Sequence, residues 1–209
     1  MTSRLPSRRA ERLVLVLRAA ITAIAALIVT FAQERTGEFA LLVFSMFALA
    51  LAVLFFAESI WVRPKQGNVV PRVLGALHLL AGSLAQLLDA TPDVAFHWVL
   101  IGWAAATGAF ELAVGVAGAR RGAAAGDGRD RIVVGALTLI LAVVSLVVSP
   151  GYALDYFIEE AGQSFTLTGT IVGVGLFGGW AAIVAVFLGI GAMSPAPARE
   201  AAPSQKDKP

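Results

Sequence analysis

Long apolar segments alternate with short polar breaks along the chain. A helix needs about 20 mostly apolar residues to cross a hydrocarbon core of roughly 30 Å. Six segments reach or approach this length and are apolar on every face, which is typical of helices in lipid rather than of amphipathic surface helices. The predicted spans are residues 13–31, 39–62, 69–88, 94–119, 132–148 and 166–192.

Composition excludes the soluble classes of protein. Hydrophobic residues make up 58% of the 209 residues and charged residues 14%, against about 25% charged in ordinary globular domains. So few charges cannot cover the surface of a soluble chain of this size, so a soluble enzyme and a disordered chain are both excluded. We expect an all-α polytopic membrane protein with six transmembrane helices, whose main partner is the lipid bilayer.

The polar breaks alternate in charge, and Arg35 is the one basic residue among the acidic breaks. The positive-inside rule therefore predicts cytoplasmic N- and C-termini in a multi-pass protein of the bacterial inner (plasma) membrane. We expect residues 1–12 to form a basic cytoplasmic N-terminus, 13–193 the transmembrane domain and 194–209 a disordered cytoplasmic tail. The predicted cytoplasmic basic residues are Arg4, Arg8, Arg9, Arg12, Arg63, Lys65, Arg72, Arg120, Arg121, Arg129, Arg131, Arg199, Lys206 and Lys208, and the predicted external acidic residues are Glu34, Glu38, Asp89, Asp93, Asp155, Glu159 and Glu160.

The spans contain an internal repeat. Residues 73–79 read Val-Leu-Gly-Ala-Leu-His-Leu, and residues 133–139 read Val-Val-Gly-Ala-Leu-Thr-Leu. Placing Arg18 opposite Gly75 and Gly135 extends the pattern to three helical hairpins, approximately residues 13–62, 69–119 and 132–192. Because each unit has two spans, all three are expected to have the same orientation as parallel repeats.

Residues 98–112 read Trp-Val-Leu-Ile-Gly-Trp-Ala-Ala-Ala-Thr-Gly-Ala-Phe-Glu-Leu and lead to Ala-Arg-Arg-Gly at 119–122. This pattern resembles the HdeD-like family of bacterial membrane proteins, which is associated with acid resistance and built from a short repeat. Arg18, in place of a small residue, and Val184, near the position that matches Glu111, depart from the family pattern. The resemblance implies a six-helix envelope protein with a stress-related role, and it implies no catalytic residues.

Four ionisable residues lie inside the predicted spans: Arg18, Glu58, His78 and Glu111. Each costs about 2.5–3.5 kcal/mol at the bilayer centre and therefore calls for a partner. At 1.5 Å per residue, Arg18 and Glu58 lie roughly 7.5 Å deep, whereas His78 and Glu111 lie roughly 13 Å deep. Matching depths predicts two pairs within hairpins, Arg18 with Glu58 and His78 with Glu111.

Each predicted pair has a functional and a structural interpretation. His78 beside Glu111 could bind and relay protons near neutral pH, or the two could form a structural hydrogen bond between helices. Arg18 and Glu58 are weaker candidates, because both can extend toward the nearby interface. Among these residues, Glu111 is the one we expect to matter most for function.

Other chemistry is not indicated by the sequence. There is no cysteine, and His78 and His97 lie near opposite faces, so no metal, cofactor or catalytic site is expected, and no nucleic acid is expected as a partner. Gly102, Gly108 and the glycines of residues 169–179 form small-residue faces that pack helices within one chain or in a homo-oligomer. Residues 152–160 are expected to form a short interfacial helix or an irregular loop.

These observations favour a non-enzymatic integral membrane protein that contributes to envelope or acid-stress tolerance. The alternative is a proton or small-solute transporter or channel that uses an intramembrane His–Glu pair. A polar cavity that contains Glu111 would favour transport, whereas a dry core with Glu111 bonded to His78 would favour a scaffold.

Overall fold

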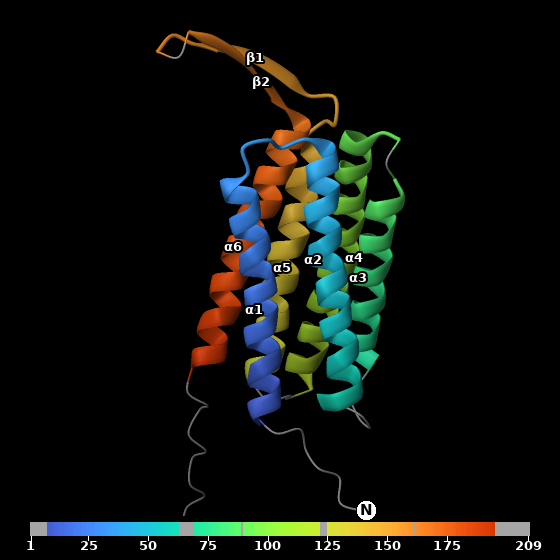
Figure 1. The fold of residues 1–209 in the computed structure, drawn as a ribbon. Coiled ribbons are helices and arrows are strands. Elements are labelled where there is room, and N and C mark those ends of the chain that lie inside the picture. Colours follow the sequence, from blue (N-terminus) through green and yellow to red (C-terminus); the bar gives the residue numbers. More distant parts are fainter. Residues whose placement is uncertain (1–7, 63–68, 89, 122–124, 161, 195–209) are drawn as a thin grey trace, which may run out of the picture.

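The protein is a bundle of membrane-spanning helices, in a computed structural model that describes residues 8–62, 69–88, 90–121, 125–160 and 162–194 (Figure 1). Six helices among these residues are long and apolar enough to cross a membrane, which confirms the predicted all-α polytopic fold. They are α1 (Arg8–Phe31), α2 (Gly37–Ala57), α3 (Val69–Leu87), α4 (Pro92–Arg120), α5 (Ala125–Val147) and α6 (Gly169–Met193).

Some sequence predictions fall outside the described residues. These are most of the N-terminal segment (1–7), the tail after Ser194, and the topological charges of Arg63, Lys65 and Asp89. Within the described part, α1 begins and α6 ends at the same end of the bundle, which we call the terminal end (Figure 1). The opposite end carries two strands and is called the hairpin end.

Several helix boundaries have local causes. The Thr36 hydroxyl accepts a hydrogen bond from the Phe39 backbone N–H at the start of α2, and the Thr168 hydroxyl accepts one from the Ile171 N–H at the start of α6. Helix α4 begins at Pro92, where the missing N–H has no helical partner to lose. Helix α5 begins at Ala125, before the predicted residue 132. Its polar first turns precede the apolar stretch from which the span was predicted.

The end of α2 is irregular. A π-helical turn, η1 (Glu58–Val62), continues α2 toward the terminal end. Such turns are rare, and they change which side chains face the core, so they often occur at functional sites. Here the π turn contains two buried polar residues, Glu58 and Ser59. It thereby directs a carboxylate into the bundle rather than toward lipid.

The segment between α5 and α6 is a β-hairpin, so the predicted helix or irregular loop is wrong. Strands β1 (Ala153–Ile158) and β2 (Gln163–Thr168) pair antiparallel, and they project from the hairpin end (Figure 1). The Tyr156 and Phe165 rings, which are directly opposite in this register, stack with centroids 5.9 Å apart. Such cross-strand aromatic pairs stabilise a hairpin. As a result α6 begins at Gly169, after the predicted residue 166.

The closest helix pairs are not the predicted hairpins. They are α4 with α5, α1 with α6, and α2 with α3, so each pair joins the second helix of one predicted hairpin to the first helix of another. Helices α2, α4 and α6 also contact one another. Three hairpins repeated around a common axis would produce this pattern, although the repeat itself stays a prediction. Hydrogen bonds join two of these pairs, from the Ser45 hydroxyl to the Gly82 carbonyl and from Arg12 to the Ser194 carbonyl.

Helices α4 and α5 pack closely through glycine. A Cβ atom at Gly135 would lie 2.5 Å from the backbone nitrogen of Leu112, and one at Gly108 would lie 2.8 Å from that of Leu139. By contrast, a Cβ at Gly102, Gly175 or Gly179 would meet nothing within 4 Å. Packing within the chain therefore accounts for Gly108, while homo-oligomer contacts through the open glycines stay a prediction.

The substitution Gly135→Ala is expected to destabilise the protein by about 1–3 kcal/mol, because the new methyl group would push α5 away from the α4 backbone. The matched control is Gly179→Ala on α6, where the added methyl group has room. Thermal unfolding in detergent would measure the difference. Equal melting temperatures for the two variants would contradict the close α4–α5 packing.

Candidate functional site

An ion pair lies inside the bundle between α1 and α4. The Arg18 Nη2 atom donates a hydrogen bond to the Glu111 Oε1 atom at 3.0 Å, and the two side chains are only 13% and 5% exposed. The Arg18 guanidinium also lies over the Phe55 ring of α2, 4.9 Å from its centroid. Both contacts stabilise the buried guanidinium, whose charge is costly to bury and cannot be removed by deprotonation.

This ion pair corrects the predicted pairing. Arg18 was expected to pair with Glu58, and Glu111 with His78, yet the ion pair joins Arg18 to Glu111 across two predicted hairpins. His78 instead forms its hydrogen bond within α3, where its Nδ1 atom lies 2.8 Å from the Leu74 carbonyl oxygen. Its buried ring contacts Phe47, Phe55 and Trp103. Matching depths therefore predicted the wrong partners for Arg18, Glu111 and His78.

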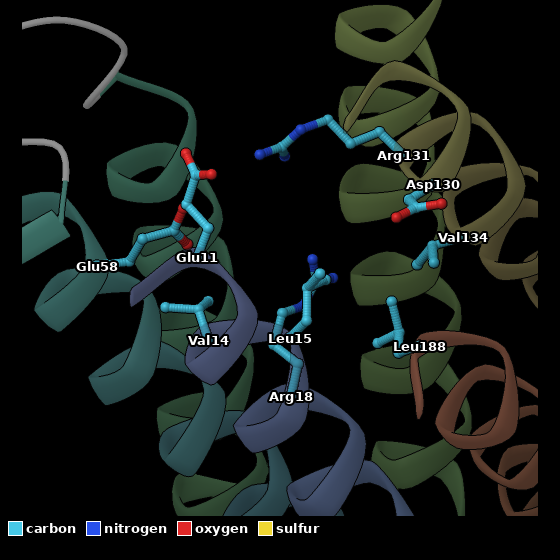
Figure 2. Close-up of a pocket in the computed structure, with 9 residues that line it drawn as sticks. All are labelled: Glu11, Val14, Leu15, Arg18, Glu58, Asp130, Arg131, Val134 and Leu188. Atoms are coloured by element: carbon cyan, nitrogen blue, oxygen red, sulfur yellow. The ribbon is translucent and has the colours of Figure 1, made fainter. Parts of the chain in front are cut away.

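A polar cavity leads from the terminal end to Arg18. This terminal cavity has a volume of about 50 Å³, and Figure 2 shows Arg18 pointing into it from α1. Arg131 of α5 extends across it toward the side that carries Glu11 and Glu58 (Figure 2). Its lining residues are Glu11, Val14, Leu15, Arg18, Glu58, Asp130, Arg131, Val134 and Leu188. Glu11 lies in the first turn of α1, Glu58 begins η1, and Asp130 and Arg131 lie in the first two turns of α5.

A second, smaller cavity lies deeper in the bundle. This central cavity has a volume of about 20 Å³ and shares Arg18, Val134 and Leu188 with the terminal cavity. Glu111 and His78 both line it. The hydroxyls of Thr107 and Thr138 and the Trp103 and Trp180 side chains add to its polar lining. The Arg18–Glu111 ion pair therefore lies where the two cavities meet.

Aromatic side chains fill the bundle on the hairpin side of the central cavity. This aromatic cluster consists of Phe44, Phe47, Phe96, Trp103, Phe177 and Trp180, contributed by α2, α4 and α6. Its rings pack mostly edge to face, with the Trp103 and Trp180 centroids 5.2 Å apart. Edge-to-face contacts are the favoured geometry for aromatic pairs. The cluster separates the polar cavities from the hairpin end.

Sequence reasoning found four site residues and missed others. Arg131 was assigned only to the predicted cytoplasmic charges, Glu11 and Asp130 were not singled out, and Trp103 was taken as part of a family pattern. The repeat did contain one useful signal, because it aligns His78 with Thr138. Both side chains bond to the carbonyl four residues earlier, Leu74 and Val134 respectively, and both line the central cavity.

The fold and this site define a multi-pass membrane protein with an ion pair buried between its spans. Comparison with models of protein families, with curated proteins and with solved structures found no match to this chain. Within the described part of the chain, no three His, Asp or Glu residues are grouped as metal ligands would be. The HdeD-like resemblance accordingly stays a prediction from the sequence.

Proposed function

We propose that the protein is a non-enzymatic membrane transporter that takes up protons, or a solute no larger than water, at the Arg18–Glu111 ion pair. The observation that carries the proposal is the position of this pair at the junction of two cavities whose walls include ionisable or hydroxyl side chains. A glutamate that is buried in the membrane and reached through a polar cavity is typical of proton pathways. This modifies the hypothesis of a direct His–Glu pair, since Arg18 takes the place of His78.

The proposed direction of access follows from the charges at the bundle ends. Described basic residues gather at the terminal end, among them Arg9, Arg12, Arg72, Arg120 and Arg121. Following the positive-inside rule, we propose that this end faces the cytoplasm of a bacterial inner membrane. Protons would then reach the terminal cavity from the cytoplasm and encounter Glu11, Glu58 and Asp130 before Glu111.

The second candidate function is an envelope or acid-stress protein of the HdeD-like type that transports nothing. The aromatic cluster favours this candidate, because tightly packed rings stand between the central cavity and the hairpin end. In a transporter, the same cluster would be the closed side of an alternating-access cycle. The two candidates therefore differ in whether the cluster ever opens.

Proton flux into liposomes that contain a pH-sensitive dye distinguishes the two candidates. A transporter should acidify the lumen under an imposed gradient, and Glu111→Gln should reduce the rate by about 100-fold, the low end of the effect of a positioned proton-transfer group. The control is Glu159→Gln in the exposed turn of the β-hairpin, which should leave the rate unchanged. Flux equal to that of empty liposomes would overturn the transporter and leave the second candidate.

A further inference from the structure

The central cavity has the size of a single water molecule. Its volume of about 20 Å³ exceeds the roughly 10–15 Å³ that one water requires, and it leaves little room for anything larger. Glu111 and His78 lie on its wall without bonding to each other. Cavities with apolar walls stay dry, whereas those with several polar partners hold ordered water.

Two buried donor atoms, on residues that line this cavity, have no hydrogen-bond partner among the described residues. They are the indole Nε1 of Trp103 and the guanidinium Nε of Arg18. Trp103 is 4% exposed, and both residues line the cavity. Trp180 provides the contrast, because its Nε1 donates to the Thr138 hydroxyl at 3.2 Å. Buried donors are nearly always paired with protein or with ordered water, so these two indicate an acceptor inside the cavity.

The same cavity is also lined by acceptors. A carbonyl oxygen can only accept, so the His78 Nδ1 atom facing Leu74 carries the proton, and the Nε2 atom of the neutral ring is an acceptor. The Glu111 carboxylate accepts from Arg18 at Oε1 and has acceptor capacity beyond that bond. One water could thus accept from Trp103 or Arg18 and donate toward Glu111 and His78.

We propose that the central cavity holds one ordered water that relays a proton between Glu111 and His78; the relay rests on the proposed uptake of protons. A proton that arrives through the terminal cavity binds the Glu111 carboxylate. Glu111 passes a proton to the water as the water passes another of its own to His78 Nε2. The water is regenerated, Glu111 returns to its charged form, and His78 becomes a cation whose Nδ1–H still donates to Leu74.

Besides Glu111, the charged groups around the relay come from α1, η1 and α5, and Glu11 of α1 is one of them through the terminal cavity. Arg18 faces it from α1, Glu58 from η1, and Asp130 and Arg131 from α5 through the adjoining terminal cavity. Helix α6 contributes Trp180 and aliphatic side chains. Arg18 and Arg131 oppose a positive charge on His78, while the carboxylates that line the two cavities favour one. The aromatic cluster keeps the relayed proton from passing His78 toward the hairpin end.

Solid-state NMR on the full chain in liposomes can detect this water directly. With tryptophan and histidine labelled with ¹⁵N, the Trp103 Nε1–H and His78 Nε2 signals should each show magnetisation transfer from water protons, called water transfer below. Substituting Val184, which lines the cavity from α6, by leucine should fill the space and remove both transfers. The matched control is Val186→Leu, at a position of α6 that is 62% exposed and outside the cavity, and it should keep them. If Val184→Leu does not fold, Val134→Ile fills the cavity from α5 instead.

The outcomes separate the water from the transport function. Absence of water transfer to Trp103 in the unmodified protein would overturn the water site, whatever the flux. Water transfer combined with a flux that falls at least tenfold in Val184→Leu, but not in Val186→Leu, would support the relay. Water transfer with equal flux in both variants would overturn the proton relay but would still support the water site. An unmodified protein without flux would overturn the relay together with the proposed function.

Discussion

Replacing Glu111 by leucine is expected to destabilise the protein by about 3–5 kcal/mol, because the Arg18 guanidinium would stay buried without its counter-charge. Arg18→Leu should cost less, since a carboxyl group that loses its partner can bind a proton and become neutral, which a guanidinium cannot do. The double variant Arg18→Leu/Glu111→Leu should regain most of the loss, because two apolar side chains replace a buried pair at little cost. Thermal unfolding in detergent would measure all three.

The control for this series is Glu34→Leu in the exposed connection between α1 and α2, where removal of a carboxylate should have little effect. The double-mutant cycle isolates the interaction energy of the pair. If the losses of the two single variants simply add in the double variant, Arg18 and Glu111 do not form an ion pair in the membrane. An additive result would also remove the main support for the transport proposal.

The fold could be predicted from the sequence because lipid imposes a simple rule. Every backbone polar group must be bonded within its own segment, so apolar stretches of sufficient length become helices. That rule does not apply outside the hydrocarbon core, and the wrong predictions from the sequence concern segments that lie there. The first turns of α5 are polar and lie beyond the apolar stretch, and the segment after Val147 pairs as strands through contacts such as Tyr156 with Phe165.

The site could be predicted only in part, for a geometric reason. Sequence position gives the depth of a residue along its helix, and this identified Arg18, His78 and Glu111 as residues that need partners. It does not give the order of helices around the bundle. In the structure α1 packs chiefly on α6 and reaches α4 across the interior, so Arg18 meets Glu111. The π turn that buries Glu58 also has no periodic signal in the sequence.

The aromatic cluster is the second feature in which we expect a single substitution to lower the stability of the protein strongly. Phe47 is 3% exposed and contacts His78, Phe44, Trp103, Phe177 and Trp180. Phe47→Ala is expected to destabilise the protein by about 3–5 kcal/mol, because it removes these contacts and leaves a cavity in the centre of the bundle. The matched control is Met46→Ala, since the neighbouring Met46 is 64% exposed on the lipid-facing side of α2. Thermal unfolding of both variants checks the difference.

The same variant tests whether the cluster is the barrier between the two ends of the protein. The new cavity of Phe47→Ala would adjoin His78 and open the aromatic cluster, so water should reach the hairpin end more easily. Proton flux into liposomes should then rise in Phe47→Ala and remain unchanged in Met46→Ala. A destabilised Phe47→Ala protein with unchanged flux would show that the rings only hold the helices together. A rise in flux that Glu111→Gln abolishes would place the ion pair and the cluster on one proton path.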